Sequence, residues 1–401
     1  MSPRSSHSQP GALRPVSTAN ARLRTLAGQL LTFGFDGTTL TPELRSTLRD
    51  LQPGGVILFA RNITDAHQTH GLLRAVQKHS ERPLFRCVDL EGGTVDRLRD
   101  VLGPAPSVQD VVAGGPAVYR EHGQLLGAES SALGFNVDFA PVLDLRLPSS
   151  LAVLGSRTVS ADPAATARYA RAFLLGLRDE GIVGCGKHFP GLGEAALDTH
   201  KDLPSISKSW KELWAQDLEP YRMLARQLPF VMVAHCAYPQ VTGKAVPASL
   251  SRKWIDGILR KKIGYTGLVV SDDLEMGGVM NGSTVEEAAI GTILAGADCY
   301  LVCHNSELVH RAAEAVVAEA ERSKVFRARV ETAARRVLMA KRRWKALQRP
   351  FPAAPTEVKL NKLRQWLWTY AETLRLAAIA RQQKAGGPNG AARSGNSTVQ
   401  Q

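Results

Sequence analysis

Eight short, almost continuously apolar runs alternate with amphipathic stretches, and this alternation constrains the fold more than any other sequence feature. The runs lie near residues 30–35, 54–60, 84–90, 135–140, 182–189, 230–236, 267–273 and 298–304. Runs that are apolar on both faces are typical of parallel strands covered by helices. Eight such units predict an α/β fold, a (β/α)₈ barrel of the TIM type. The alternative is an open doubly wound sheet, but no G-x-G-x-x-G follows the first run.

The stretches between the runs carry signals for helix ends. Pro163 stands at a first helical position, and Gly181 follows the end of the same helix. The stretch 251–264 opens with Ser and closes on Gly264. Acidic residues stand near the starts of two further helices, in 284–297 and 306–324, where the helix dipole favours negative charge.

The basic charge of the chain is concentrated at its two ends. Residues 322–401 hold 18 Lys+Arg and 3 acids, and residues 1–25 hold 4 Arg and no acid. We expect a flexible basic tail over 1–25, the barrel over 26–347, and a short basic helical appendage over 348–401. Within that appendage, 349–355 reads as a linker, 356–384 as an amphipathic helix, and 386–401 as disordered. An apolar stripe of the helix is predicted to pack on the barrel: Leu363, Trp366, Leu367, Tyr370 and Leu374.

Composition indicates a globular protein that does not enter a membrane. Hydrophobic residues make up 44% and charged residues 22% of the chain, with no apolar run of membrane-spanning length. The first 25 residues lack an apolar h-region, so we expect no signal peptide. The five cysteines stand in no metal-ligand spacing, which favours reduced, buried thiols and a cytoplasmic location. The basic end is read as a solvated helix face rather than as a nucleic-acid site. We expect a monomer.

Polar residues follow four of the apolar runs at their carboxyl ends. They are Asp89, Lys187 with His188, His235, and Asp272 with Asp273. In a (β/α)₈ barrel the functional site is built at these ends of the strands. A pocket rich in hydrogen-bonding groups and short of aromatic residues suits a polyhydroxylated ligand.

The irregular stretch KHFPGLGEAALDTH, residues 187–200, permits two interpretations. Its titratable groups either form a polar cluster that pins a loop or place an acid/base catalyst on a mobile arm.

Five motifs occur in the order found in family 3 glycoside hydrolases. They are DLEGGTVDRL (89–98), LGSRTVSADP (154–163), KHFPGLGEAALDTH, AHCAYPQVTGKAVPASLS (234–251) and VVSDDLEM (269–276). The chain most resembles the single-domain bacterial β-N-acetylhexosaminidases of peptidoglycan recycling, over roughly residues 26–345. The pairing of K-H-F-P-G with a D-x-H eleven residues after the Lys is highly specific. The resemblance implies a retaining exo-acting β-N-acetylglucosaminidase that removes terminal β-linked N-acetylglucosamine from muropeptide fragments.

The resemblance also implies roles for single residues, with no cofactor and no metal. Asp272 would be the nucleophile, and His200, held by Asp198, would be the acid/base. The sugar would be bound by Asp89, Arg97, Arg157, Lys187 and His188. Each of these residues could instead have a purely structural role. Asp272 could cap a helix, Asp198 and His200 could pin the loop, and Arg97 could form an ion pair with Glu91 or Asp96.

Some positions depart from the family pattern. Leu192 stands where the family loop has His, and Glu194-Ala195 replace Asp-Thr. Thr94 replaces the usual Arg, and Asp96 replaces the usual Gln. These changes bear on loop dynamics and aglycone preference rather than on Asp272 or the D-x-H pair.

Three rival functions stay open. A β-glucosidase or β-xylosidase of the same family would generally need a second domain, which about 56 residues after Lys345 cannot build. A non-catalytic sugar-binding barrel is disfavoured by the intact Asp272 and His200 set. A GlcNAc phosphorylase is compatible with a histidine acid/base, because a histidine repels an incoming phosphate less than a carboxylate would.

Overall fold

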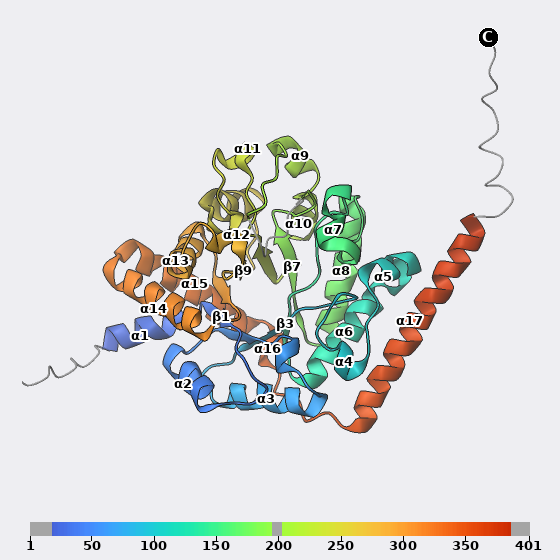
Figure 1. Cartoon of the computed structure of the whole chain (residues 1–401), viewed down its shortest axis with the longest axis horizontal. Helices are drawn as coiled ribbons and strands as arrows, with labels where there is room; N and C mark the ends of the chain where they lie inside the picture. Colours follow the sequence, from blue (N-terminus) through green and yellow to red (C-terminus); the bar gives the residue numbers. More distant parts are fainter. Residues whose placement is uncertain (1–17, 195–202, 386–401) are drawn as a thin grey trace, which may run out of the picture.

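The computed structural model describes residues 18–194 and 203–385, and within them eight parallel strands close into a barrel. Helices surround this barrel (Figure 1). The strand order around the barrel is β1-β10-β9-β8-β7-β6-β3-β2, and β1 closes the ring by pairing Leu31 with Tyr300 of β10. The (β/α)₈ prediction and all eight predicted strand positions are confirmed. The strands are β1 (Leu31–Phe33), β2 (Gly55–Ile57), β3 (Phe85–Val88), β6 (Val137–Asp138), β7 (Val183–Phe189), β8 (Phe230–Val233), β9 (Leu268–Asp273) and β10 (Cys299–Val302).

Helices surround the barrel where the sequence predicts them. Asp162 caps α8, accepting hydrogen bonds from the N–H groups of Ala164 and Ala165, and Pro163 is its first residue. Thr284 caps α13 in a capping box with Glu287. The larger helices are α2 (Pro42–Leu51), α3 (Ala66–Lys78), α6 (Tyr119–Leu133), α8 (Pro163–Asp179), the π-helical η6 (Lys253–Lys262), α13 (Val285–Ala295), α14 (Ser306–Arg322) and α15 (Lys324–Arg343). The shorter ones are α4 (Arg99–Leu102), α5 (Val108–Gly114), α7 (Leu151–Leu154), α9 (Trp210–Ala215), α10 (Glu219–Leu224), α11 (Pro239–Thr242), α12 (Gly277–Met280) and α16 (Lys345–Gln348).

Helix α1 (Thr18–Gly28) begins inside the stretch 1–25 that sequence analysis assigned to a flexible tail. Leu23 is buried in the core, and Arg24 forms a two-bond ion pair with Glu314 of α14. Packing of Leu23 and Ala27 explains the difference, because burial of apolar side chains stabilises a helix that is too short to be stable alone.

The interior of the barrel is filled by alternate residues of the strands. Phe85, Phe139 and Phe230 pack edge to face there, and Phe230 also contacts Trp344 at the foot of the barrel. Lys341 of α15 donates to the carbonyl of Gly54 and is buried among apolar groups, and this burial lowers its pKa to about 7. Helices α15 and α16 therefore cover the end of the barrel where the strands begin.

The C-terminal helix α17 (Glu357–Ala385) lies along α4, α5 and α6 on the outside of the barrel (Figure 1). The predicted stripe is its buried face: Leu363, Leu367, Tyr370 and Leu374 are buried, and Trp366 donates from Nε1 to Glu121. The segment 349–355 has no helix or strand, as expected of a linker, yet Phe351 packs against His70 and Arg86. The described part of the appendage is thus joined to the barrel through Phe351 and along α17.

Candidate active site

The alternation of side chains along the strands directs three predicted residues into the barrel mouth. Phe85 and Cys87 of β3 face the barrel interior, so Asp89 follows on the same face. Val183 and Cys185 of β7 lead in the same way to Lys187, and Leu268 and Val270 of β9 lead to Asp272. The chain thereby brings a nucleophile candidate and two sugar-binding candidates to one end of the barrel.

The buried carboxylate of Glu91 forms ion pairs with two of the residues predicted to bind the sugar, Arg157 and Lys187. Arg157 donates two hydrogen bonds of 2.8 Å to it, and the Nζ of Lys187 lies 2.6 Å from its Oε1. Lys187 also donates to Asp89 at 2.8 Å. Burial opposes the charge on Glu91, but Arg157 and Lys187 outweigh it and hold the pKa of that carboxyl well below its usual range. The cluster is therefore ionised and fixed before any ligand binds.

A hairpin places Glu91 in this cluster. Strands β4 (Leu90–Gly92) and β5 (Val95–Asp96) pair antiparallel directly after β3. The turn uses Gly92 and Gly93 at φ of +80° and +63°, and a Cβ on Gly92 would lie 2.2 Å from the carbonyl oxygen of Pro106. Only glycine fits there, which explains the EGG of the motif.

His188 is held by a carboxylate that sequence analysis did not identify. Its Nδ1 lies 2.6 Å from Oδ2 of Asp144, which is fully buried. Oδ1 of Asp144 also accepts the backbone N–H of Leu192 at 2.7 Å. One carboxylate thus fixes both the imidazole and the start of the following loop.

Asp272 is partly buried and is surrounded by donors and cationic groups. Burial alone would raise its pKa, but His188, His235 and Lys187 and the backbone N–H of Asp273 lower it below the ordinary carboxyl value. That N–H donates to Oδ1 of Asp272 at 2.9 Å. His235 is buried between the Ser249 hydroxyl and the carbonyl of Asp273. Asp272 is therefore a carboxylate at neutral pH, as a nucleophile requires.

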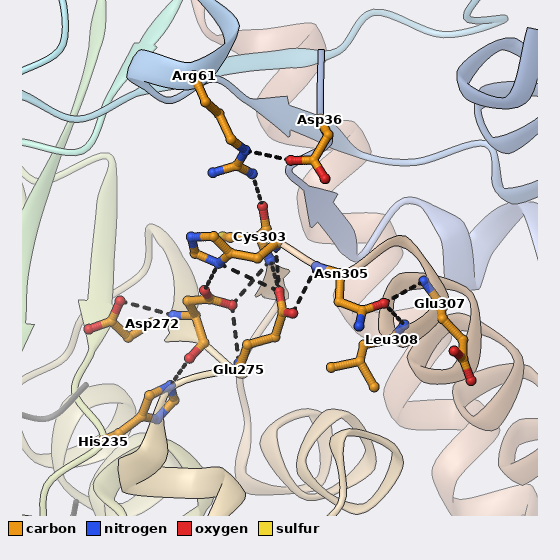
Figure 2. Close-up of polar contacts among 11 residues, drawn as sticks. Asp36, Arg61, His235, Asp272, Glu275, Cys303, Asn305, Glu307 and Leu308 are labelled. Atoms are coloured by element: carbon orange, nitrogen blue, oxygen red, sulfur yellow. Dashed lines mark hydrogen bonds and ion pairs between the residues drawn. The ribbon is translucent and has the colours of Figure 1, made fainter. Parts of the chain in front are cut away.

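Asp273, the adjacent carboxylate, is directed to the segment after β10 rather than to the site, as the alternation of side chains along a strand predicts. Its Oδ1 accepts the N–H groups of Cys303 and Glu275, and its Oδ2 lies 3.1 Å from Nδ1 of His304. Figure 2 shows Asp272 pointing away from this group. Asp273 is thus occupied in holding the segment after β10.

Glu275 completes this polar group. It accepts the backbone N–H groups of Cys303, His304 and Asn305 (Figure 2). One atom each from Asp273, Glu275 and His304 lies within 4.8 Å of the others, a spacing that could suit a metal ion. Their carboxylate oxygens, however, already receive backbone donors, so this trio is better suited to clamping the chain than to binding a cation.

Arg97 has neither of the ion pairs that sequence analysis allowed for it. Glu91 is taken by Arg157 and Lys187, and Asp96 accepts the N–H groups of Leu98 and Ala105. The guanidinium lies 5.9 Å from the ring centre of Phe59, and within the described part of the chain its Nε has no hydrogen-bond partner. Arg97 retains donors for a ligand.

The predicted acid/base pair, Asp198 and His200, lies outside the described residues. The stem that precedes it is described: Leu192, the residue that replaces the family's His, is buried, and Tyr238 donates to the carbonyl of Gly191. Glu194 lies 3.6 Å from the Nζ of Lys208, which pairs with Asp217 at 2.7 Å. The departures at 192 and 194 therefore have structural roles at the root of the loop.

The structure thus brings together Asp89, Arg157, Lys187, His188 and Asp272, and adds Asp144, Glu91 and His235. His235 stood in a quoted motif at a strand end, and Glu91 entered only as a possible partner of Arg97. Asp144 follows β6 in a run of apolar residues, and its position after a strand was the only signal for it.

Such an arrangement, with one ionised carboxylate facing a rigid set of hydrogen-bond donors and acceptors, fits chemistry at the anomeric carbon of a sugar. The comparisons agree with it. Residues 22–340 match the Glycosyl hydrolase family 3 N terminal domain. A beta-hexosaminidase of Bordetella parapertussis is 40% identical over 281 residues, which are 68% of this chain and 79% of that protein. A beta-hexosaminidase of Pseudomonas aeruginosa is 39% identical over 299 residues, covering 74% and 87%.

Solved structures show the same likeness. A family 3 beta-N-acetylglucosaminidase from Paenibacillus sp. str. FPU-7 superposes with a TM-score of 0.81 at 31% identity, covering 87% of this chain and 68% of that one. Native NagZ from Neisseria gonorrhoeae superposes with a TM-score of 0.65 at 31% identity, covering 77% and 98%. Within the described residues, no helix has the length and apolar character needed to cross a bilayer. The chain belongs to glycosyl hydrolase family 3 and is a glycoside hydrolase.

Proposed function

We propose that this protein is a retaining, exo-acting β-N-acetylglucosaminidase that removes terminal β-linked N-acetylglucosamine. The observation that supports this most strongly is Asp272, an ionised carboxylate on the inward face of β9 that is surrounded by His188, His235 and Lys187. The specificity for N-acetylglucosamine is supported by the names of the relatives, which are hexosaminidases and a beta-N-acetylglucosaminidase.

The reaction would proceed by double displacement. Asp272 attacks the anomeric carbon and forms a glycosyl ester, while His200 gives its proton to the departing glycosidic oxygen. In the second step His200 takes a proton from water, and the resulting hydroxyl displaces Asp272, so the anomeric configuration is retained. Asp198 would orient His200 and stabilise its protonated form.

The binding residues would act through the atoms that their ion pairs leave available. Asp89 is the more accessible partner of its pair, with 18% of its side chain exposed against 3% for Lys187. We expect Asp89 to accept from sugar hydroxyls, and Lys187, His188, Arg157 and Arg97 to donate to them. Because the pairs around Glu91 are already formed, little reorganisation is needed when the sugar binds.

The natural substrate would be a muropeptide fragment in which N-acetylglucosamine is linked to anhydro-N-acetylmuramic acid. With this substrate, the enzyme would act as a monomer in the cytoplasm, in the recycling of peptidoglycan. The five cysteines are unpaired and buried, which supports a reducing compartment.

A substrate panel tests the proposal. The nitrophenyl β-glycosides of N-acetylglucosamine, glucose and xylose are compared, each with and without inorganic phosphate. We expect turnover of the N-acetylglucosaminide alone, with free sugar as product in both conditions. Preference for the glucoside or xyloside would contradict the assigned specificity. Formation of a sugar phosphate would identify a phosphorylase, and no turnover of any substrate would leave a sugar-binding barrel.

A further inference from the structure

A cavity lies at the opposite end of the barrel from Asp272. It has a volume of about 740 Å³, within the range of small-ligand pockets. Its floor includes Val183 and Leu268, the first residues of β7 and β9, whereas Asp272 stands near the carboxyl end of β9. The two sites are therefore separated by the length of the strands.

The floor of this cavity is apolar and its rim is cationic. Leu174, Leu175, Leu228, Trp344 and Ala346 contribute apolar surface. The rim includes Arg171, Arg178, Arg226, Arg336, Arg343 and Arg349. Among the described residues that line the cavity there is no Asp or Glu. The cavity thus combines a strongly positive rim with a surface that water solvates poorly.

Most of these guanidinium groups have no carboxylate of their own. Arg171, Arg178, Arg226 and Arg343 are exposed and form no ion pair with any residue that the structure describes. Arg349 donates to the backbone carbonyl of Glu180.

Of the carboxylates near the rim, Asp179 and Asp298 are already paired, whereas Glu180 interacts electrostatically with Arg349 but forms no ion pair within the described residues. Arg336 lies 3.9 Å from Asp298, but that buried carboxylate is already bonded to Arg260 and lies 3.6 Å from Arg329. Asp179, at the end of α8, pairs with Arg120. The rim therefore keeps a surplus of positive charge.

Three of the six rim arginines, 336, 343 and 349, belong to the basic stretch 322–401 whose role the glycosidase chemistry leaves open. Clustered like charges cost free energy in the unliganded state, and a bound anion removes that cost. Among the described residues that line the cavity, Trp344 is the one aromatic residue, and it contacts Phe230 edge to face inside the barrel foot. A single ring does not provide the series of stacking platforms that single-stranded nucleic-acid sites use.

We propose that this cavity binds an amphipathic anion, with its phosphate or carboxylate head among the arginines and its apolar body on the floor. Guanidinium groups pair with such heads through two parallel hydrogen bonds, and the concave apolar floor favours an alkyl chain over an extended polyanion. The ligand can come from two sources, as a free amphiphile or as a lipid of an anionic membrane surface.

Titration calorimetry with octyl phosphate, below its micelle concentration, tests the proposal. We expect saturable binding, weaker binding of butyl phosphate by up to about fourfold per methylene removed, and no binding of octanol or of inorganic phosphate at the same concentrations. The variant Arg226→Gln/Arg343→Gln should weaken binding by about tenfold or more. Its matched control, Arg45→Gln/Arg74→Gln, removes two exposed charges from α2 and α3 and should bind like the parent protein. Thermal melts establish that both variants fold.

Four results would overturn the proposal: octanol binding as well as octyl phosphate, equal losses in both double variants, unchanged binding in Arg226→Gln/Arg343→Gln, or displacement of octyl phosphate by N-acetylglucosamine. Sedimentation with phosphatidylglycerol and phosphatidylcholine vesicles separates the two sources. Retention by phosphatidylglycerol vesicles that the cavity variant loses identifies a membrane lipid, and octyl phosphate binding without such retention identifies a free amphiphile.

Discussion

Asp144 holds His188 through a contact of 2.6 Å between Oδ2 and Nδ1, and the same carboxylate receives the N–H of Leu192 at 2.7 Å. The fully buried Asp144 therefore joins a predicted sugar-binding residue to the root of the loop that leads to His200. Neither the imidazole nor the backbone at Leu192 can shift without breaking one of these bonds.

Replacing Asp144 by Asn should weaken both functions of the carboxylate, because an amide oxygen cannot serve both donors as the carboxylate does. We expect kcat/KM on the nitrophenyl N-acetylglucosaminide to fall by about tenfold to a hundredfold, and the free energy of unfolding to fall by about 1–3 kcal/mol. Steady-state kinetics and urea unfolding measure the two effects. Asp110→Asn, in the exposed cap of α5, is the matched control, and an Asp144→Asn enzyme with the activity of that control would refute the positioning role.

Glu91→Gln should destabilise the protein in a pH-dependent manner. The variant leaves the partly buried Arg157 without its carboxylate and removes one of the two carboxylates of the buried Lys187, which costs about 3–5 kcal/mol at neutral pH. The folded pKa of Glu91 lies below its ordinary value of 4.5, so the stabilisation is complete above 4.5 and is lost as the pH falls toward the folded pKa.

The difference in unfolding free energy between the parent and Glu91→Gln should therefore be constant from pH 7 to about pH 5 and shrink at lower pH. Urea unfolding at several pH values measures it. A difference that grows as the pH falls would show that Glu91 is not ionised in the folded protein.

Removing the chain after Leu347 tests the domain assignment. Every matched motif precedes this point, so we expect the turnover number to be kept. Because the truncation exposes the barrel surface that Leu367 and Tyr370 cover, we expect the melting temperature to fall. A folded truncated chain without turnover would show that α17 supports the site.

Leu367→Ala alone should lower the free energy of unfolding by about 2–5 kcal/mol. Trp368→Ala, at an exposed position of the same helix, is the control.

His200→Ala should reduce turnover by about 10²- to 10⁴-fold, with the larger loss on substrates whose leaving group needs a proton. A disaccharide should therefore suffer more than an activated nitrophenyl glycoside. Asp198→Asn removes the charge that favours imidazolium, so the activity maximum should shift to lower pH. If both variants bind more weakly yet keep the leaving-group dependence and pH profile of the parent, the pair only pins the loop, and Glu194 becomes the candidate donor.

The barrel and much of the site could be predicted because they depend on local patterns. The period of two along β3, β7 and β9 directs Asp89, Lys187 and Asp272 inward. The contacts that stabilise these side chains could not be predicted in the same way. Asp144 meets His188, and Glu91 meets Arg157, only after long stretches of chain have folded back, and no local pattern encodes such pairs. The position of Leu23 in the core likewise depends on contacts of α1 with α14 and α15, which lie about three hundred residues further along the sequence.

The central claim is that Asp272 forms a covalent bond to the sugar, and trapping that intermediate tests it most directly. The enzyme is incubated with a slow substrate of the 2-deoxy-2-fluoro type, digested, and mapped by mass spectrometry, while NMR follows the anomeric configuration of the first product. We expect the label on Asp272 and retention of configuration. A label on Asp273, which is bonded to Cys303 and His304, or inversion at the anomeric carbon, would contradict the mechanism.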